Sequence, residues 1–187
     1  MHTTTADYHL TKNKSEYQLT THAPTITTPP QLTHDRTKQR LISTGHKPYL
    51  HALGITDARG EVIPAAQDKF RQINKYVEIL NGLIKQLPSD APLRIADMGA
   101  GKGYLTFALY DHLANTLKRQ VKVTGVEYRE DLVVLCNRIA AESAFTGLTF
   151  VQGTIADYNT KDATIVIALH ACDTATDDAI ASAVKSN

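Results

Sequence analysis

The feature that most constrains the fold of this 187-residue chain is the run from Leu93 to Gly103, which reads LRIADMGAGKG. Short apolar residues lead to Asp97, and Gly99, Gly101 and Gly103 then follow at every second position. A strand that ends in this way must turn sharply, and glycines allow a ligand to approach the backbone closely. The run therefore predicts a buried strand, a ligand-binding loop and a following helix.

A second strand is predicted over residues 121–127, and it ends in the carboxylate of Glu127. In a doubly wound parallel sheet this carboxylate would lie beside the glycine loop, where it can accept both hydroxyls of a ribose. The two strand ends together predict a pocket for a cofactor that contains adenosine. The alternative is a glycine-rich turn that binds nothing, and the placement of Glu127 argues against it.

The spacing of the glycines narrows the choice of cofactor. A dinucleotide fingerprint, G-x-G-x-x-G, would need glycine at position 104, where this chain has Tyr104. The phosphate-binding pattern G-x-x-x-x-G-K-[ST] is absent from the sequence. A nicotinamide-dependent oxidoreductase therefore stays as the less favoured alternative.

Strands and helices alternate from residue 65 onward. Apolar residues at steps of three and four from Phe70 to Leu87 predict a helix with one core-facing stripe. On its polar face, Lys69, Gln72 and Lys75 are expected to face solvent, with the alternative that Lys69 or Gln72 reaches over the cofactor. Strands are expected at about 93–97, 121–127, 148–151 and 163–169.

This pattern predicts an α/β fold with a parallel sheet covered by helices on both faces. With the four strands numbered along the chain, the expected order in space is 3-2-1-4. Right-handed crossovers and a pocket beside the first strand both require this reversal.

Composition divides the chain into three predicted parts. Residues 1–45 are rich in Thr and Pro and contain a predicted β-hairpin, with strands at Tyr8–Thr11 and Glu16–Thr20. Residues 46–64 form a connector, and residues 65–187 form the cofactor-binding domain.

Charge and residue usage exclude several classes of protein. The formal net charge of +1 provides no general attraction to nucleic acid or membrane, and the apolar runs are too short to span a bilayer. The two cysteines do not form a disulfide framework or a zinc site, and the histidine spacing matches no metal site. A cytoplasmic protein without a bound metal is expected.

The sequence ends soon after the fourth predicted strand, at residues 163–169. An apolar strand left at the edge of a sheet is a template for further pairing. We therefore expect a C-terminally incomplete fragment of a longer protein. The alternative is a small natural domain whose edge is covered by its N-terminal segment or by a partner, including self-association through that edge.

The acidic-x-Gly-x-Gly-x-Gly loop from Asp97 to Gly103 resembles the first motif of class I S-adenosylmethionine-dependent methyltransferases. The resemblance implies S-adenosyl-L-methionine as cofactor, with Asp97 helping to hold the methionine end and Glu127 taking the ribose hydroxyls. The other residues that it assigns to the cofactor are Gly99, Ala100, Gly101, Gly103, Tyr104, Tyr128, Thr154 and Ile155.

The sequence after the fourth strand, His170-Ala171-Cys172-Asp173-Thr174-Ala175-Thr176-Asp177, resembles one branch of that superfamily. The branch carries His-x-Cys-(Gly/Asp)-x-Ala-Thr-Asp at this point, and it includes tRNA 2′-O-methyltransferases and methyltransferase-like bacterial proteins. The resemblance runs from about residue 34 to the end and implies RNA as one acceptor. Members also have a Pro-Cys-Cys segment that this chain lacks.

A hydroxyl acceptor would need a base, and His170 and Asp173 are the titratable groups that are well placed for that role. The alternative is that these two residues hydrogen-bond the loop or cap the next helix. Cys172 follows Ala171 and not proline, which disfavours a nucleophilic cysteine. A binding module that has lost methyl transfer remains the main alternative to an active enzyme.

Overall fold

The computed structural model describes residues 1–14, 16–28, 40–88 and 91–169, together with residues 177, 180, 181 and 184. The chain divides into two compact units, Met1–Gln39 and Arg40–Asn187. No helix in the described part is long and apolar enough to cross a bilayer.

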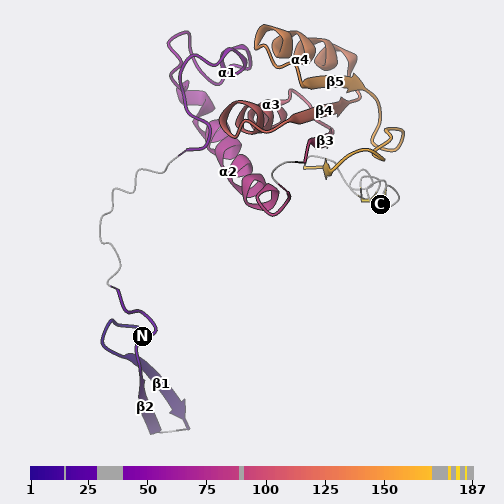
Figure 1. The fold of residues 1–187 in the computed structure, drawn as a ribbon. Helices are drawn as coiled ribbons and strands as arrows, with labels where there is room; N and C mark the ends of the chain where they lie inside the picture. The colour runs from indigo at the N-terminus through magenta and orange to yellow at the C-terminus, as the bar shows by residue number, and fades with distance from the viewer. Residues whose placement is uncertain are drawn as a thin grey trace. The chain divides into compact units, whose positions relative to one another are not determined.

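The first unit contains an antiparallel hairpin of β1 (Asp7–Asn13) and β2 (Glu16–His22), shown in Figure 1. This confirms the predicted hairpin, although both strands are longer than expected. Most of its residues are exposed, and the buried side chain in these strands is the carboxylate of Asp7. Asp7 accepts hydrogen bonds from the backbone N–H and the hydroxyl of Thr25. The hairpin is therefore held by backbone pairing and polar contacts rather than by an apolar core.

The second unit contains the predicted alternation of helices and parallel strands. The strand at residues 163–169 is shorter than predicted, and the helix after the glycines continues as a π-helix at Asp111–Thr116. The elements in chain order are α1 (Pro48–Ala52), a 3₁₀ turn (Pro64–Ala66), α2 (Gln67–Ile84), β3 (Leu93–Met98), α3 (Tyr104–Tyr110), β4 (Val121–Glu127), α4 (Glu130–Glu142), β5 (Leu148–Gln152) and β6 (Ile165–Ile167).

The sheet of this unit has the strand order β5-β4-β3-β6, and all of its pairs are parallel. This is the predicted 3-2-1-4 order. Asp97 near the end of β3 lies opposite Gly125 of β4 and Ile167 of β6. The strand order reverses at β3, so the crevice at the carboxyl end of β3 is where this topology places a ligand.

The helices pack on one face of the sheet. Ile95 and Val123 point to this face and join the apolar stripe of α2 in the main core. The stripe is confirmed, because Phe70, Ile73 and Val77 are fully buried. Further members of this core from the strands and the other helices are Leu50, Leu93, Phe107, Leu113, Val121, Cys136, Ile139, Leu148, Phe150 and Ile167.

The other face of the sheet has a smaller cluster built on Ala96, Met98 and Val126. Within the described part of residues 40–169, loop residues such as Ile155 and Tyr158 pack on this face, and no helix does. The expected helices on both faces are therefore not seen among the described residues 40–88 and 91–169. The reason is the direction of the crossovers between parallel strands, because a right-handed crossover covers the face that its direction sets. The crossovers from β3 to β4 and from β4 to β5 run the same way along the sheet, so their helices lie on the same face. Only the link from β5 to β6 runs back past β3.

Candidate functional site

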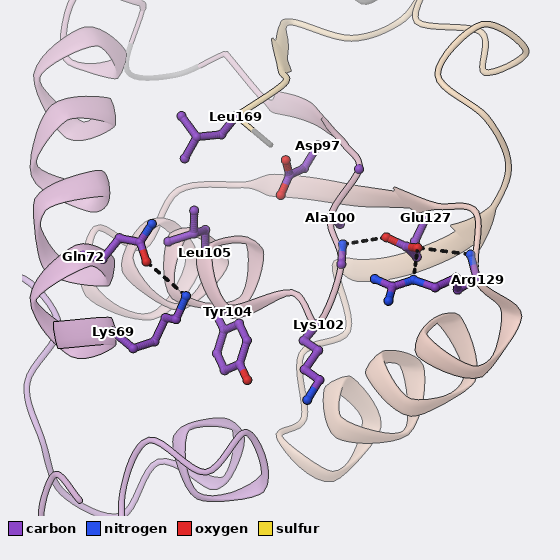
Figure 2. Close-up of a pocket in the computed structure, with 12 residues that line it drawn as sticks. Lys69, Gln72, Asp97, Ala100, Lys102, Tyr104, Leu105, Glu127, Arg129 and Leu169 are labelled. Atoms are coloured by element: carbon purple, nitrogen blue, oxygen red, sulfur yellow. Dashed lines mark hydrogen bonds and ion pairs between the residues drawn. The ribbon is translucent and has the colours of Figure 1, made fainter. Parts of the chain in front are cut away.

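A hollow of about 450 Å³ lies at the carboxyl end of β3, between α2 and the end of β4 (Figure 2). It occupies the crevice that the strand order predicts. Its lining residues come from α2, β3, the glycine loop, α3 and the segment after β4. They are Lys69, Gln72, Asp97, Gly99, Ala100, Gly101, Lys102, Tyr104, Leu105, Glu127, Arg129 and Leu169.

A second hollow of about 310 Å³ adjoins the first and shares Gly99 and Glu127 with it. Its other lining residues are Val126, Tyr128, Gly153, Thr154, Ile155 and Ala156. The fold therefore brings Tyr128, Thr154 and Ile155 together with Gly99 of the glycine loop, and their contact with a cofactor stays a prediction. The two hollows form an elongated site with Glu127 at their junction.

The glycine loop adopts left-handed backbone conformations, with φ of +72° at Gly99 and +59° at Gly101. A Cβ atom at either of these positions would meet no heavy atom within 4 Å, so the space above them is open. The backbone N–H groups of Gly99 and Ala100 donate to the carbonyl of Val126, which holds the loop against β4. The loop thus presents bare backbone to the site.

Gly103 differs from the other two glycines. It lines neither hollow, and a Cβ atom there would lie 2.9 Å from the ring of Phe150 and 3.0 Å from that of Phe107. Gly103 directly precedes α3 and has a left-handed φ of +71°. The structure thus gives Gly103 a packing constraint, and its cofactor contact stays a prediction.

The Glu127 carboxylate is 7% exposed and accepts three hydrogen bonds. One comes from the backbone N–H of Gly101 at 2.8 Å, and two come from Arg129, through its backbone N–H at 3.1 Å and its Nε at 2.9 Å. Burial alone would raise the pKa of Glu127, but the hydrogen bonds from Arg129 and Gly101 outweigh burial and lower it. Glu127 is therefore held as an ionised acceptor beside the loop.

The Asp97 carboxylate is also buried, at 6% exposure, but it has fewer donors. The Thr106 hydroxyl donates to it at 2.6 Å. Burial raises the pKa of Asp97 to about 6, and the Thr106 hydrogen bond only partly offsets that rise. Tyr76 on α2 is itself buried, and that burial, together with the nearby Asp97 charge, raises the pKa of Tyr76.

The polar face of α2 forms one wall of the first hollow (Figure 2). Lys69 Nζ donates to Gln72 Oε1 at 3.1 Å and lies 5.2 Å from the centroid of the Tyr104 ring. Lys69 and Gln72 are exposed, as expected from the sequence, and both also line the site. Sequence reasoning also missed Thr106 and Arg129, which meet the two carboxylates only in the folded chain.

The predicted catalytic residues His170 and Asp173 lie outside the described residues, as does Cys172. Leu169, which directly precedes them, lines the first hollow. Cys136 is buried, its thiol lies 3.8 Å from the carbonyl oxygen of Gly101, and burial raises its pKa to about 12, so it remains a thiol. Within the described ranges, no group of three or more His, Cys, Asp or Glu side chains is arranged to hold a metal.

Comparison with known proteins finds similarities in sequence and in fold. A protein-lysine N-methyltransferase of Schizosaccharomyces pombe, efm4, is 28% identical over 87 residues, which are 46% of this chain and 37% of that protein. The SAH-bound methyltransferase PaMTH1 of Podospora anserina has a TM-score of 0.54 and 14% identity over 77% of this chain and 58% of its own. This structural likeness concerns the fold.

The family comparison goes further. The chain spans 37% of the length of its Schizosaccharomyces relative. A family model described as a methyltransferase domain matches residues 68–187, which is more than half of this chain and includes both hollows. The chain therefore belongs to the methyltransferase-domain family, and this membership implies S-adenosylmethionine as its cofactor.

Proposed function

We propose that this chain binds S-adenosylmethionine across the two adjoining hollows and takes part in methyl transfer from it. The observation that carries the proposal is Glu127, an ionised, buried acceptor at the junction of the hollows. A ribose has two adjacent hydroxyl groups, and a fixed carboxylate can accept a hydrogen bond from each of them. The open space above Gly99 and Gly101 fits the same cofactor, because it leaves room for a ligand against the backbone.

The position of Glu127 orients the rest of the cofactor. With the ribose at Glu127, the adenine occupies the second hollow, against Tyr128, Thr154 and Ile155. The methionine end then extends into the first hollow toward Asp97. The bound cofactor supplies an electrophilic methyl group on its sulfonium. The residues of the chain supply alignment, which lowers the barrier by holding the reacting groups in position.

The acceptor is proposed to approach past Leu169, because this residue borders the first hollow and directly precedes His170. The resemblance of residues 170–177 to the His-x-Cys branch favours a hydroxyl of RNA, with His170 or Asp173 as the base. The name of the Schizosaccharomyces relative favours a protein lysine as the second candidate. Methyl transfer from labelled cofactor to RNA and to protein extracts distinguishes the two, and His170→Ala should reduce turnover with RNA.

Calorimetric titration with S-adenosylhomocysteine tests the cofactor site. Glu127→Ala should weaken binding about tenfold, or about 1.4 kcal/mol, because the ribose loses its acceptor. Glu142→Ala, which removes an exposed carboxylate on α4, is the matched control. Unchanged affinity in Glu127→Ala, or tighter binding of a nicotinamide dinucleotide by the native chain, would contradict the proposed site.

A further inference from the structure

The wall that α2 contributes to the first hollow carries a cation opposite the buried Asp97 (Figure 2). Three cationic side chains line this hollow: Lys69, Lys102 and Arg129. Arg129 is paired with Glu127 at 2.9 Å. In Figure 2, Lys102 points away from Asp97, whereas the Lys69 amine turns toward Gln72 on the α2 wall, across the hollow from Asp97. Lys69 is therefore the cation best placed to contact the end of a ligand that extends from Glu127 toward Asp97.

Within the described part of the chain, the Lys69 ammonium is held in place and has no carboxylate partner. It donates one hydrogen bond, to Gln72 Oε1, and it lies 5.2 Å from the centroid of the Tyr104 ring. An ammonium has three N–H donors, so two remain for a ligand. The amide and the ring are both uncharged, so the full positive charge is available to an anion.

Asp97 provides the opposite charge in the same hollow. Its carboxylate is almost fully buried and accepts a hydrogen bond from Thr106, and its pKa, raised to about 6, still lies below neutral pH. A hollow with an anion at the strand end and a cation on the helical wall is complementary to a zwitterion. Among the parts of S-adenosylmethionine, the amino-acid end has this character, with one ammonium and one carboxylate.

We propose that Lys69 binds the carboxylate of the amino-acid end of the cofactor, and that Gln72 and Tyr104 position the Lys69 ammonium for this contact. The inference rests on the proposed function. It makes Lys69, on a helix that precedes the sheet, a specificity-determining residue. Ligands with adenosine and an α-amino acid are then preferred over ligands that carry adenosine alone.

The test compares two ligands that differ at this end: S-adenosylhomocysteine, which has the amino acid, and 5′-methylthioadenosine, which lacks it. Lys69→Met should weaken S-adenosylhomocysteine about tenfold or more and change 5′-methylthioadenosine by less than about twofold. Lys75→Met is the matched control, because Lys75 lies on the same helix, is exposed, and pairs with Glu78 at 3.3 Å. Lys69→Arg should restore part of the lost affinity.

Glu127→Ala separates this inference from the proposed function. It should weaken both ligands, because both contain the ribose. If Lys69→Met weakens both ligands equally, or neither, while Glu127→Ala weakens both, the proposed function stands and the role of Lys69 is wrong. If the native chain binds neither ligand, or Glu127→Ala changes neither, both proposals are overturned.

Discussion

Asp97 and Glu127 lie at the carboxyl ends of two neighbouring parallel strands, β3 and β4, and both are almost fully buried. Their environments nevertheless shift their pKa values in opposite directions. Burial raises the pKa of Asp97 to about 6, whereas hydrogen bonds from Arg129 and Gly101 lower the pKa of Glu127 despite its burial. The difference lies in the donors. Among the described residues, Glu127 accepts three hydrogen bonds, two of them from backbone N–H groups, and Asp97 accepts one from Thr106.

The contrast between these carboxylates separates a residue that stabilises the folded loop from one whose buried charge a ligand would compensate. At Glu127 the fold completes the hydrogen bonding of the acceptor, so the carboxylate stabilises the loop even without a ligand. At Asp97 the fold leaves a buried charge with little compensation, and a cationic ligand group would supply the rest. Functional sites commonly carry such a stability cost, because the site is built for the ligand and not for the fold.

The largest expected effect comes from Asp97→Asn. The folded pKa of Asp97 is raised from 3.8 to about 6, so the fold favours the protonated form, and stability from this group falls as pH rises between these values. Above pH 6 the cost is roughly 3 kcal/mol. Asparagine keeps an acceptor for Thr106 and removes the charge. We expect Asp97→Asn to raise the free energy of unfolding at pH 7.5 by up to that amount, measured by urea denaturation.

Asp162→Asn, at an exposed surface carboxylate, is the matched control for this variant. It should leave the free energy of unfolding within about 0.5 kcal/mol of the native value. Destabilisation by Asp97→Asn at pH 7.5 would show that Asp97 is satisfied in the fold, which would remove the contrast with Glu127.

Glu127→Gln should act with the opposite sign. The folded pKa of Glu127 is lowered, so its stabilising contribution is present above the unfolded pKa and is lost as pH falls through the folded pKa. Hydrogen bonds to a charged group contribute more than neutral ones, and we expect a loss of about 2 kcal/mol at pH 7.5. Urea denaturation beside Glu142→Gln measures this effect, and equal stability of the two variants would contradict it.

The pH dependence of cofactor binding sharpens the contrast. If the ammonium of S-adenosylhomocysteine faces Asp97, protonation of Asp97 removes the attraction, so affinity should fall as pH drops through about 6. Near pH 5 about a tenth of the Asp97 carboxylates would be ionised, and affinity should be roughly tenfold lower than at pH 7, or about 1.4 kcal/mol. Titrations at both pH values measure this loss. Asp97→Asn should abolish the dependence, and a native affinity that is flat over this range would refute it.

The smallest effect is expected from Arg129→Ala. The Arg129 side chain is 60% exposed, and exposed ion pairs contribute little because solvent screens them. The backbone N–H groups of Gly101 and Arg129 still donate to Glu127 in this variant. We expect a change below about 1 kcal/mol in urea denaturation. A loss as large as that of Glu127→Gln would show that the guanidinium, and not the backbone, holds the carboxylate.

Sequence reasoning predicted the elements whose signals are local. The strand that leads to Asp97, the glycine loop and the strand that ends in Glu127 follow from apolar runs and glycine spacing, and the structure contains all three. The parallel order also followed, because the handedness of crossovers leaves few alternatives. The packing role of Gly103 was missed, because its close neighbour Phe150 lies far along the chain.

The sequence by itself thus determined where the strands end and which backbone positions need glycine, because neighbouring residues set these features. Only the tertiary structure decided which donors reach each carboxylate. Gly101 meets Glu127 across 26 positions, and α2 brings Lys69 to the hollow beside Asp97. These contacts set the opposite pKa shifts of the two carboxylates. They depend on how helices and strands pack, which no local pattern records.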